Sequence, residues 1–91
     1  MEFLVQIQVT VPPQMAAQER SRLAEAEGRR GRELRQAGTI VRIWRIPGRT
    51  ANVGIWEAPD PTTLHEAIAS LPMFPYLSAE VTPLAVHPLE A

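Results

Sequence analysis

The order in which strand-like and helix-like segments follow one another constrains the fold of this chain most. Apolar residues alternate with others over residues 3–11, which is the period of a half-buried strand. Pro12-Pro13 end that strand, because proline cannot donate to a ladder. Helix-forming residues dominate 15–37, and Gly38 stands just past them, where a left-handed cap belongs. The chain is therefore predicted to begin with a strand and a long helix.

The remaining residues predict two strands, a second helix and a last strand. Segments 39–46 and 50–57 are rich in β-branched residues and flank a Pro-Gly turn, so we expect them to pair antiparallel. Asp60 followed by Pro61 is typical of a helix N-terminus, and apolar residues then recur at helical spacing as far as Leu71. Residues 79–86 are predicted to form a strand that is either at the edge of the sheet or bulged, because they contain Pro83.

The resulting order, βαββαβ, predicts an α+β ferredoxin-like sandwich, in which two helices cover one face of a four-stranded antiparallel sheet. Nothing in the composition divides residues 1–91, so we expect a single domain. The strand at 39–46 is apolar on both sides, and the connector after Pro72 adds Met73, Phe74 and Tyr76. A chain of this length cannot bury all of these side chains alone, so we expect a homo-oligomer.

The composition excludes several kinds of chemistry. Without cysteine the chain has no disulfide and no cysteine nucleophile, and without lysine it has no Schiff-base chemistry. A net charge of −1 argues against a dedicated nucleic-acid binder. The apolar runs are too short to span a membrane, and the alternating N-terminus is not typical of a signal peptide. We therefore expect a cytoplasmic protein with no membrane partner.

The long helix carries a charged residue on its apolar side. With Leu23 at 0° and about 100° per residue, Leu34 falls near 20°, Glu27 near 40° and Arg30 near −20°. An ionisable residue on a buried helix surface is either paired or functional. Glu27 is therefore either a functional carboxylate or half of a structural Glu27–Arg30 ion pair.

The hairpin around the Pro-Gly turn gathers a second group of polar residues. In a strand, Arg45 projects to the side opposite Trp44, while Arg49 follows the turn and Asn52 enters the next strand. Guanidinium groups bind carboxylates bidentately, and an amide can donate to a developing oxyanion. The alternative is a solvated hairpin whose arginines cap backbone carbonyls.

The two histidines are weaker candidates. His65 lies at the flank of the apolar side of the second helix, and His87 follows the last strand. Each is either a general acid or base or a surface residue. Their separation offers no metal-ligand spacing, so we expect no metal site.

These residues resemble the muconolactone isomerase family along nearly the whole chain. The strings that carry the resemblance are Val9 to Pro12, Gly38-Thr39, Trp44-Arg45-Ile46, Gly48, Ala51-Asn52, Leu64-His65, Leu71-Pro72-Met73-Phe74-Pro75-Tyr76, Glu80-Val81 and His87-Pro88. The resemblance implies a cytoplasmic enzyme of the β-ketoadipate pathway of aromatic breakdown, with a ferredoxin-like subunit, a ring-like decamer and no metal or organic cofactor. It implies conversion of muconolactone, a small lactone, to 3-oxoadipate enol-lactone.

The resemblance also implies which residues form the site. It points to Glu27 as the proton-transfer base, to Arg45 as the binder of the substrate carboxylate and to Asn52 as the oxyanion donor. Arg49 is a second candidate for carboxylate binding, proposed from its chemistry. The further candidates are the possible catalytic residues Tyr76 and His65 and the possible substrate-binding residues Trp44 and His87.

Four positions depart from the family pattern. Gly28 replaces a lysine that often follows the helix glutamate, and Arg42 replaces a common histidine before the tryptophan. Arg49 and Thr50 replace a histidine and an aromatic residue after the hairpin glycine. Two alternatives therefore stay open, namely a related isomerase for another small unsaturated lactone or acid, and a non-catalytic ligand-binding module.

Overall fold

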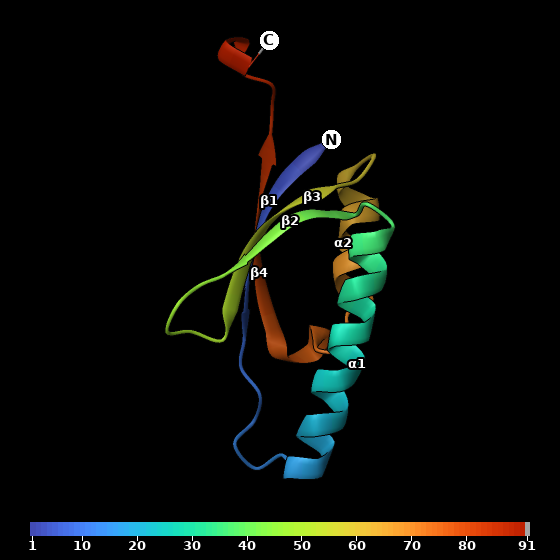
Figure 1. Ribbon diagram of the computed structural model, residues 1–91, viewed down its shortest axis with the longest axis vertical. Helices are drawn as coiled ribbons and strands as arrows, with labels where there is room; N and C mark the ends of the chain where they lie inside the picture. The colour runs from blue at the N-terminus through green and yellow to red at the C-terminus, as the bar shows by residue number, and fades with distance from the viewer. Residues whose placement is uncertain (91) are drawn as a thin grey trace.

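The computed structural model describes residues 1–90 and contains four strands, two α-helices and two short 3₁₀ helices. In chain order they are β1 (Glu2–Val9), α1 (Ala17–Gln36), β2 (Ile40–Arg45), β3 (Ala51–Glu57), α2 (Pro61–Ala69), η1 (Phe74–Tyr76), β4 (Leu77–Leu84) and η2 (Pro88–Glu90). The strands form one antiparallel sheet in the order β2-β3-β1-β4. Figure 1 shows both α-helices on the same side of this sheet. The predicted ferredoxin-like arrangement is confirmed.

The ends of the elements follow local chemistry. The Asp60 side chain accepts a hydrogen bond of 2.7 Å from the backbone N–H of Thr63, which caps α2 as its sequence predicts. Gly38, which follows the C-cap residue Ala37 of α1, has a φ of +81°, a conformation that other residues rarely adopt. The last strand begins at Leu77 rather than at residue 79, because η1 leads straight into it. Its proline, Pro83, lies in an edge strand, which pairs with β1 on one side only.

The core lies between the sheet and the helices. Phe3, Val5 and Ile7 of β1 are buried on the face that the helices cover, and Trp56 of β3 lies beside Phe3. Helix side chains close this core from the other side, contributed by Leu34 of α1 and by Leu64 and Ile68 of α2. Burial of these large apolar groups is the main stabilising contribution in a domain of this size.

The strand register decides which polar residues reach the covered face. Ile7 pairs with Asn52, and Asn52 pairs with Arg45, so these three side chains lie on the same face of the sheet. Trp44 pairs with Val53 and therefore lies on the opposite, uncovered face. The hairpin thus directs Arg45 and Asn52, but not Trp44, toward α1.

Two glycines should respond to alanine substitution in opposite directions. A Cβ atom at Gly54 would lie 2.6 Å from the carbonyl oxygen of Arg42, whereas one at Gly31 would meet nothing within 4 Å. Gly54→Ala should therefore lower the free energy of unfolding by about 1–3 kcal/mol. Gly31→Ala should raise it by about 0.5–1 kcal/mol, because alanine favours the helix.

Urea unfolding at one fixed protomer concentration measures both changes. Equal effects of the two substitutions would contradict the close approach of β2 to Gly54.

Candidate active site

Glu27 lies in the middle of α1 and faces the sheet side of the helix. Its Oε1 accepts a hydrogen bond of 2.9 Å from the backbone N–H of Met73, in the connector that follows α2. The side chain is half-buried. One backbone amide from a distant segment therefore fixes the direction of this carboxylate.

The predicted alternative of a Glu27–Arg30 ion pair is wrong. The Arg30 guanidinium lies 3.1 Å from Glu33 and donates a second hydrogen bond, of 2.9 Å, to Ser70 Oγ. Arg30 lies on the side of α1 next to the end of α2, so its side chain contacts both Glu33 and Ser70. Within residues 1–90, Glu27 takes part in no ion pair.

Burial raises the pKa of the Glu27 carboxyl above its ordinary value of 4.5, because desolvation disfavours the charged form. The Met73 N–H stabilises the carboxylate and opposes this shift, but it has the smaller effect. A desolvated carboxyl with a raised pKa is a suitable group for taking and returning a proton.

A cavity of about 170 Å³ lies beside Glu27, between α1 and the sheet. The residues that line it are Ile7, Glu27, Gly31, Ile40, Ile43, Asn52, Trp56 and Leu71. Most of this wall is apolar. Two polar atoms of its lining residues, Oδ1 of Asn52 and Nε1 of Trp56, are buried and have no hydrogen-bond partner among residues 1–90. Buried polar atoms are normally paired, so these two atoms favour a polar ligand in this cavity.

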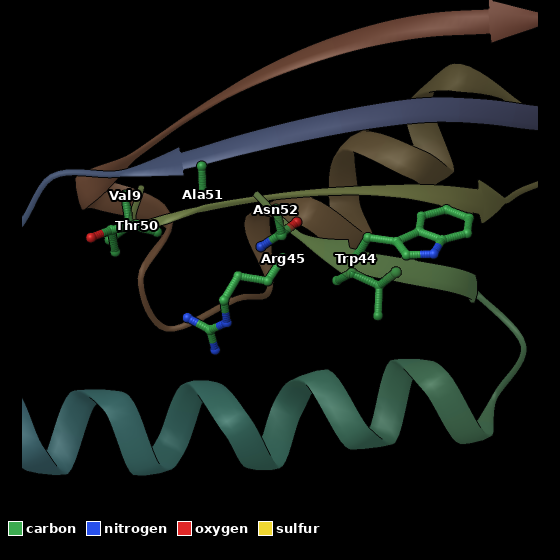
Figure 2. A pocket seen from close by; sticks show the side chains of 7 residues that line it. Val9, Trp44, Arg45, Thr50, Ala51 and Asn52 are labelled. Atoms are coloured by element: carbon green, nitrogen blue, oxygen red, sulfur yellow. The ribbon is translucent and has the colours of Figure 1, made fainter. Parts of the chain in front are cut away.

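A second pocket, of about 300 Å³, adjoins this cavity on the hairpin side. It is lined by Val9, Ile43, Trp44, Arg45, Thr50, Ala51 and Asn52. Ile43 and Asn52 belong to both walls, so the two spaces are neighbours. Figure 2 shows the Arg45 side chain extending from β2 toward α1, with Asn52 close to its base. The structure therefore brings Glu27, Asn52 and Arg45 to one region of the fold.

Trp44 and Arg49, the other two candidates in the hairpin, are placed differently from Arg45. The Trp44 ring packs with the Arg42 guanidinium, which lies 4.9 Å from its centroid, and Figure 2 shows the ring directed away from the Arg45 guanidinium. Arg49 is exposed in the turn between β2 and β3. Their substrate-binding roles stay predictions.

The remaining candidates lie outside the Glu27 cavity of this subunit. The ring of His65 packs edge-on against Phe74, with 6.0 Å between centroids, in an apolar pocket between α2 and β4. Tyr76 is half-buried in η1. His87 is exposed beyond β4, where its Nδ1 accepts a hydrogen bond of 3.0 Å from the N–H of Leu89. Their roles also stay predictions.

The sequence alone did not reveal two features of the site. Trp56 is an alternating apolar residue of a strand, and nothing in that pattern distinguishes a core tryptophan from one that faces a cavity. Met73 contributes its backbone amide, and a backbone N–H contact cannot be predicted from the type of side chain. The only signal was the position of Met73 directly after the proline that follows α2.

The described chain shows neither a metal cluster nor a membrane span. Among residues 1–90, no three histidine, aspartate or glutamate side chains gather closely enough to hold a metal ion. None of the helices in the same range combines the length and the apolar character that crossing a membrane requires.

Comparison with known proteins finds relatives along the whole chain. A family model described as muconolactone delta-isomerase matches residues 1–90. "Muconolactone Delta-isomerase 2" of Acinetobacter lwoffii is 37% identical over 87 residues, covering 96% of this chain and 91% of the relative. "Muconolactone Delta-isomerase" of Pseudomonas aeruginosa is 34% identical, with coverages of 97% and 92%. A crystal structure of a muconolactone isomerase aligns with a TM-score of 0.90 at 34% identity, covering 97% of this chain and 92% of that one.

The Glu27 carboxyl should titrate above 4.5. Carbon-detected NMR of the glutamate side chains measures its pKa, and Glu27→Gln identifies the resonance. Because the pKa is higher in the folded than in the unfolded chain, the folded state binds its proton more tightly. The stability of the parent chain relative to Glu27→Gln should therefore fall as the pH rises from the unfolded pKa through the folded pKa. A pKa at or below 4.5 would mean that the Met73 amide outweighs burial.

Proposed function

This chain belongs to the muconolactone delta-isomerase family, and on that premise we propose how its residues shift the ring double bond of muconolactone to give 3-oxoadipate enol-lactone. The observation that carries the proposal is the half-buried Glu27, which lines a mostly apolar cavity and forms no ion pair among the described residues. The substrate is a small lactone that carries an acetate arm.

The reaction is a proton transfer within one molecule. Glu27 removes the proton from the ring carbon that bears the acetate arm, and the electron pair moves through the ring to the lactone carbonyl. The resulting dienolate carries its negative charge on that oxygen. Glu27, now protonated, returns a proton to the carbon next to the carbonyl, so the double bond has moved and no atom is gained or lost. Burial suits Glu27 to both steps, because it raises the carboxyl pKa toward the pH at which the enzyme works.

Arg45 and Asn52 hold the substrate beside Glu27. The guanidinium of Arg45 extends from β2 toward α1 and binds the carboxylate of the acetate arm, as arginine binds carboxylates generally. Asn52 lies in the wall between the two pockets and turns its amide toward the lactone oxygen. The ring then occupies the cavity of Glu27 and the arm occupies the pocket of Arg45. Arg49 is the second carboxylate binder that we propose.

Family membership also supports a place in the β-ketoadipate pathway of aromatic breakdown, in the cytoplasm.

The four departures from the family pattern, at positions 28, 42, 49 and 50, lie on α1, β2 and the turn after β2. Thr50 lines the pocket of Arg45, which we assign to the arm of the substrate, and Arg49 precedes it in the turn. Activity on a lactone with an altered arm is the alternative that this placement favours.

The shape of the subunit supports assembly. Its accessible surface is 6367 Å², whereas a monomer of 10.1 kDa exposes about 5,300 Å². Its radius of gyration is 14.2 Å, against about 12 Å for a compact chain of this length. Figure 1 shows the segment after β4 projecting beyond the body, and there Val86 and Leu89 are 84% and 89% exposed. We propose a homo-oligomer in the form of a ring-like decamer.

Size-exclusion chromatography with light scattering tests the assembly. The expected mass is that of ten protomers. Val86→Asp with Leu89→Asp should lower this mass, because the charges would keep the projecting segment in water. A stable monomer of 10.1 kDa in the parent chain would contradict the proposal.

Substitutions at the site should separate chemistry from binding. Glu27→Gln should lower kcat by at least about 10²-fold, because it removes the acid–base group. Arg45→Gln should mainly raise KM, by about 10-fold to 100-fold, because it removes one charged hydrogen bond. Proton NMR of muconolactone in D₂O measures the conversion directly, and deuterium in the product would show that the base exchanges its proton with solvent.

Matched controls on the same helix are available. Glu25→Gln and Arg29→Gln make the same chemical changes at exposed positions of α1 and should leave both constants unchanged. Normal turnover by a folded Glu27→Gln variant would reject Glu27 as the base. Failure of the parent chain to convert muconolactone would direct the search to a lactone with a different arm.

A further inference from the structure

We propose that Trp56 is a further substrate-contacting residue, whose indole Nε1–H donates a hydrogen bond to the lactone carbonyl oxygen in the Glu27 cavity. The proposal rests on the proposed function and extends it. It assigns a further donor, besides Asn52, to the oxygen on which negative charge develops.

The first observation is an unpaired donor in the core. Trp56 is 1% exposed, and its Nε1 is buried without a hydrogen-bond partner among the described residues 1–90. An indole N–H can only donate, so no proton rearrangement of the side chain removes the deficit. Leaving a buried donor unpaired is unfavourable, and such a group in a folded protein needs an explanation. A ligand that supplies an oxygen atom is one.

The second observation is the position of Trp56. It lines the same cavity as Glu27, and it lies on the same face of β3 as Asn52. The other lining side chains are apolar, apart from these three residues. A ligand oxygen in this cavity therefore has few partners to choose from. Its wall is mostly apolar, and a preorganised donor in such a wall stabilises a developing negative charge.

The chemistry of the two unpaired atoms divides the roles. The buried unpaired atom of Asn52 is Oδ1, an acceptor, while that of Trp56 is a donor. A dienolate oxygen is negatively charged and accepts hydrogen bonds only. Trp56 therefore meets its requirement as it stands, whereas Asn52 must turn its amide to present Nδ2. Two donors at one oxygen would together form an oxyanion hole.

The decisive variant removes the donor and keeps the shape. Replacing Trp56 by 3-benzothienylalanine exchanges the N–H for a sulfur atom in a ring of nearly the same size. We expect kcat to fall about 10²-fold, as on removal of one oxyanion donor, with KM little changed. Trp56→Phe should lower kcat similarly. Circular dichroism and the thermal midpoint identify variants that remain folded. A folded benzothienyl variant with the parent kcat would overturn the proposal.

A binding measurement tests the contact without turnover. In a ¹⁵N-labelled chain the two tryptophans give two indole cross peaks, which Trp44→Phe assigns. The saturated lactone with the same acetate arm cannot isomerise and serves as the probe. It should move the Trp56 indole proton downfield, as a new hydrogen bond does. An unmoved Trp56 peak under saturating probe would overturn the proposal.

The results separate this proposal from the proposed function. If Glu27→Gln loses turnover while the benzothienyl variant keeps it, Glu27 stands and Trp56 has no role at the oxygen. If the parent chain fails to convert muconolactone but the Trp56 peak moves with the probe, the substrate assignment fails and the contact by Trp56 is supported.

Discussion

The pairing register between β1 and β3 controls which chemistry this fold can carry. Asn52 lies opposite Ile7, and Trp56 lies opposite Phe3. Both β3 side chains therefore lie on the face that α1 covers. A shift of one residue would exchange the two faces of β3 and turn Asn52 and Trp56 to the uncovered face. The apolar side chains of β1 make such a shift costly, because it would expose the core. The same burial that stabilises the sheet therefore positions the site.

Two opposing effects act on the ionisation of the Glu27 carboxyl. Burial disfavours its charge, and a single amide from the connector between α2 and β4 favours it. The connector therefore orients the Glu27 carboxylate through a backbone amide, although its side chains are mostly apolar. Arg30 binds Glu33 and Ser70 instead, so no ion pair among residues 1–90 fixes the carboxylate in its charged form. This balance suits the role that we propose for Glu27, in which it both takes and returns a proton.

The sequence by itself determined the fold. Alternation in residues 3–11, helical spacing over 64–71, the Asp60 cap and the Pro-Gly turn each reflect interactions between residues close in the chain. These local preferences agree with one another, so the order of the elements followed from them. The position of Glu27 toward the sheet followed as well, because the helical period fixes which residues share a side.

Only the tertiary structure decided the partners within the site. Glu27 and Met73 are 46 residues apart, and the choice between that amide and Arg30 depends on where the connector crosses α1. Arg45, Asn52 and Trp56 meet the Glu27 region through strand register and sheet order, which place distant residues together. No local pattern shows whether a strand tryptophan leaves its N–H unpaired. Local physics selects the elements, whereas hydrogen bonding and cavities arise from how those elements pack.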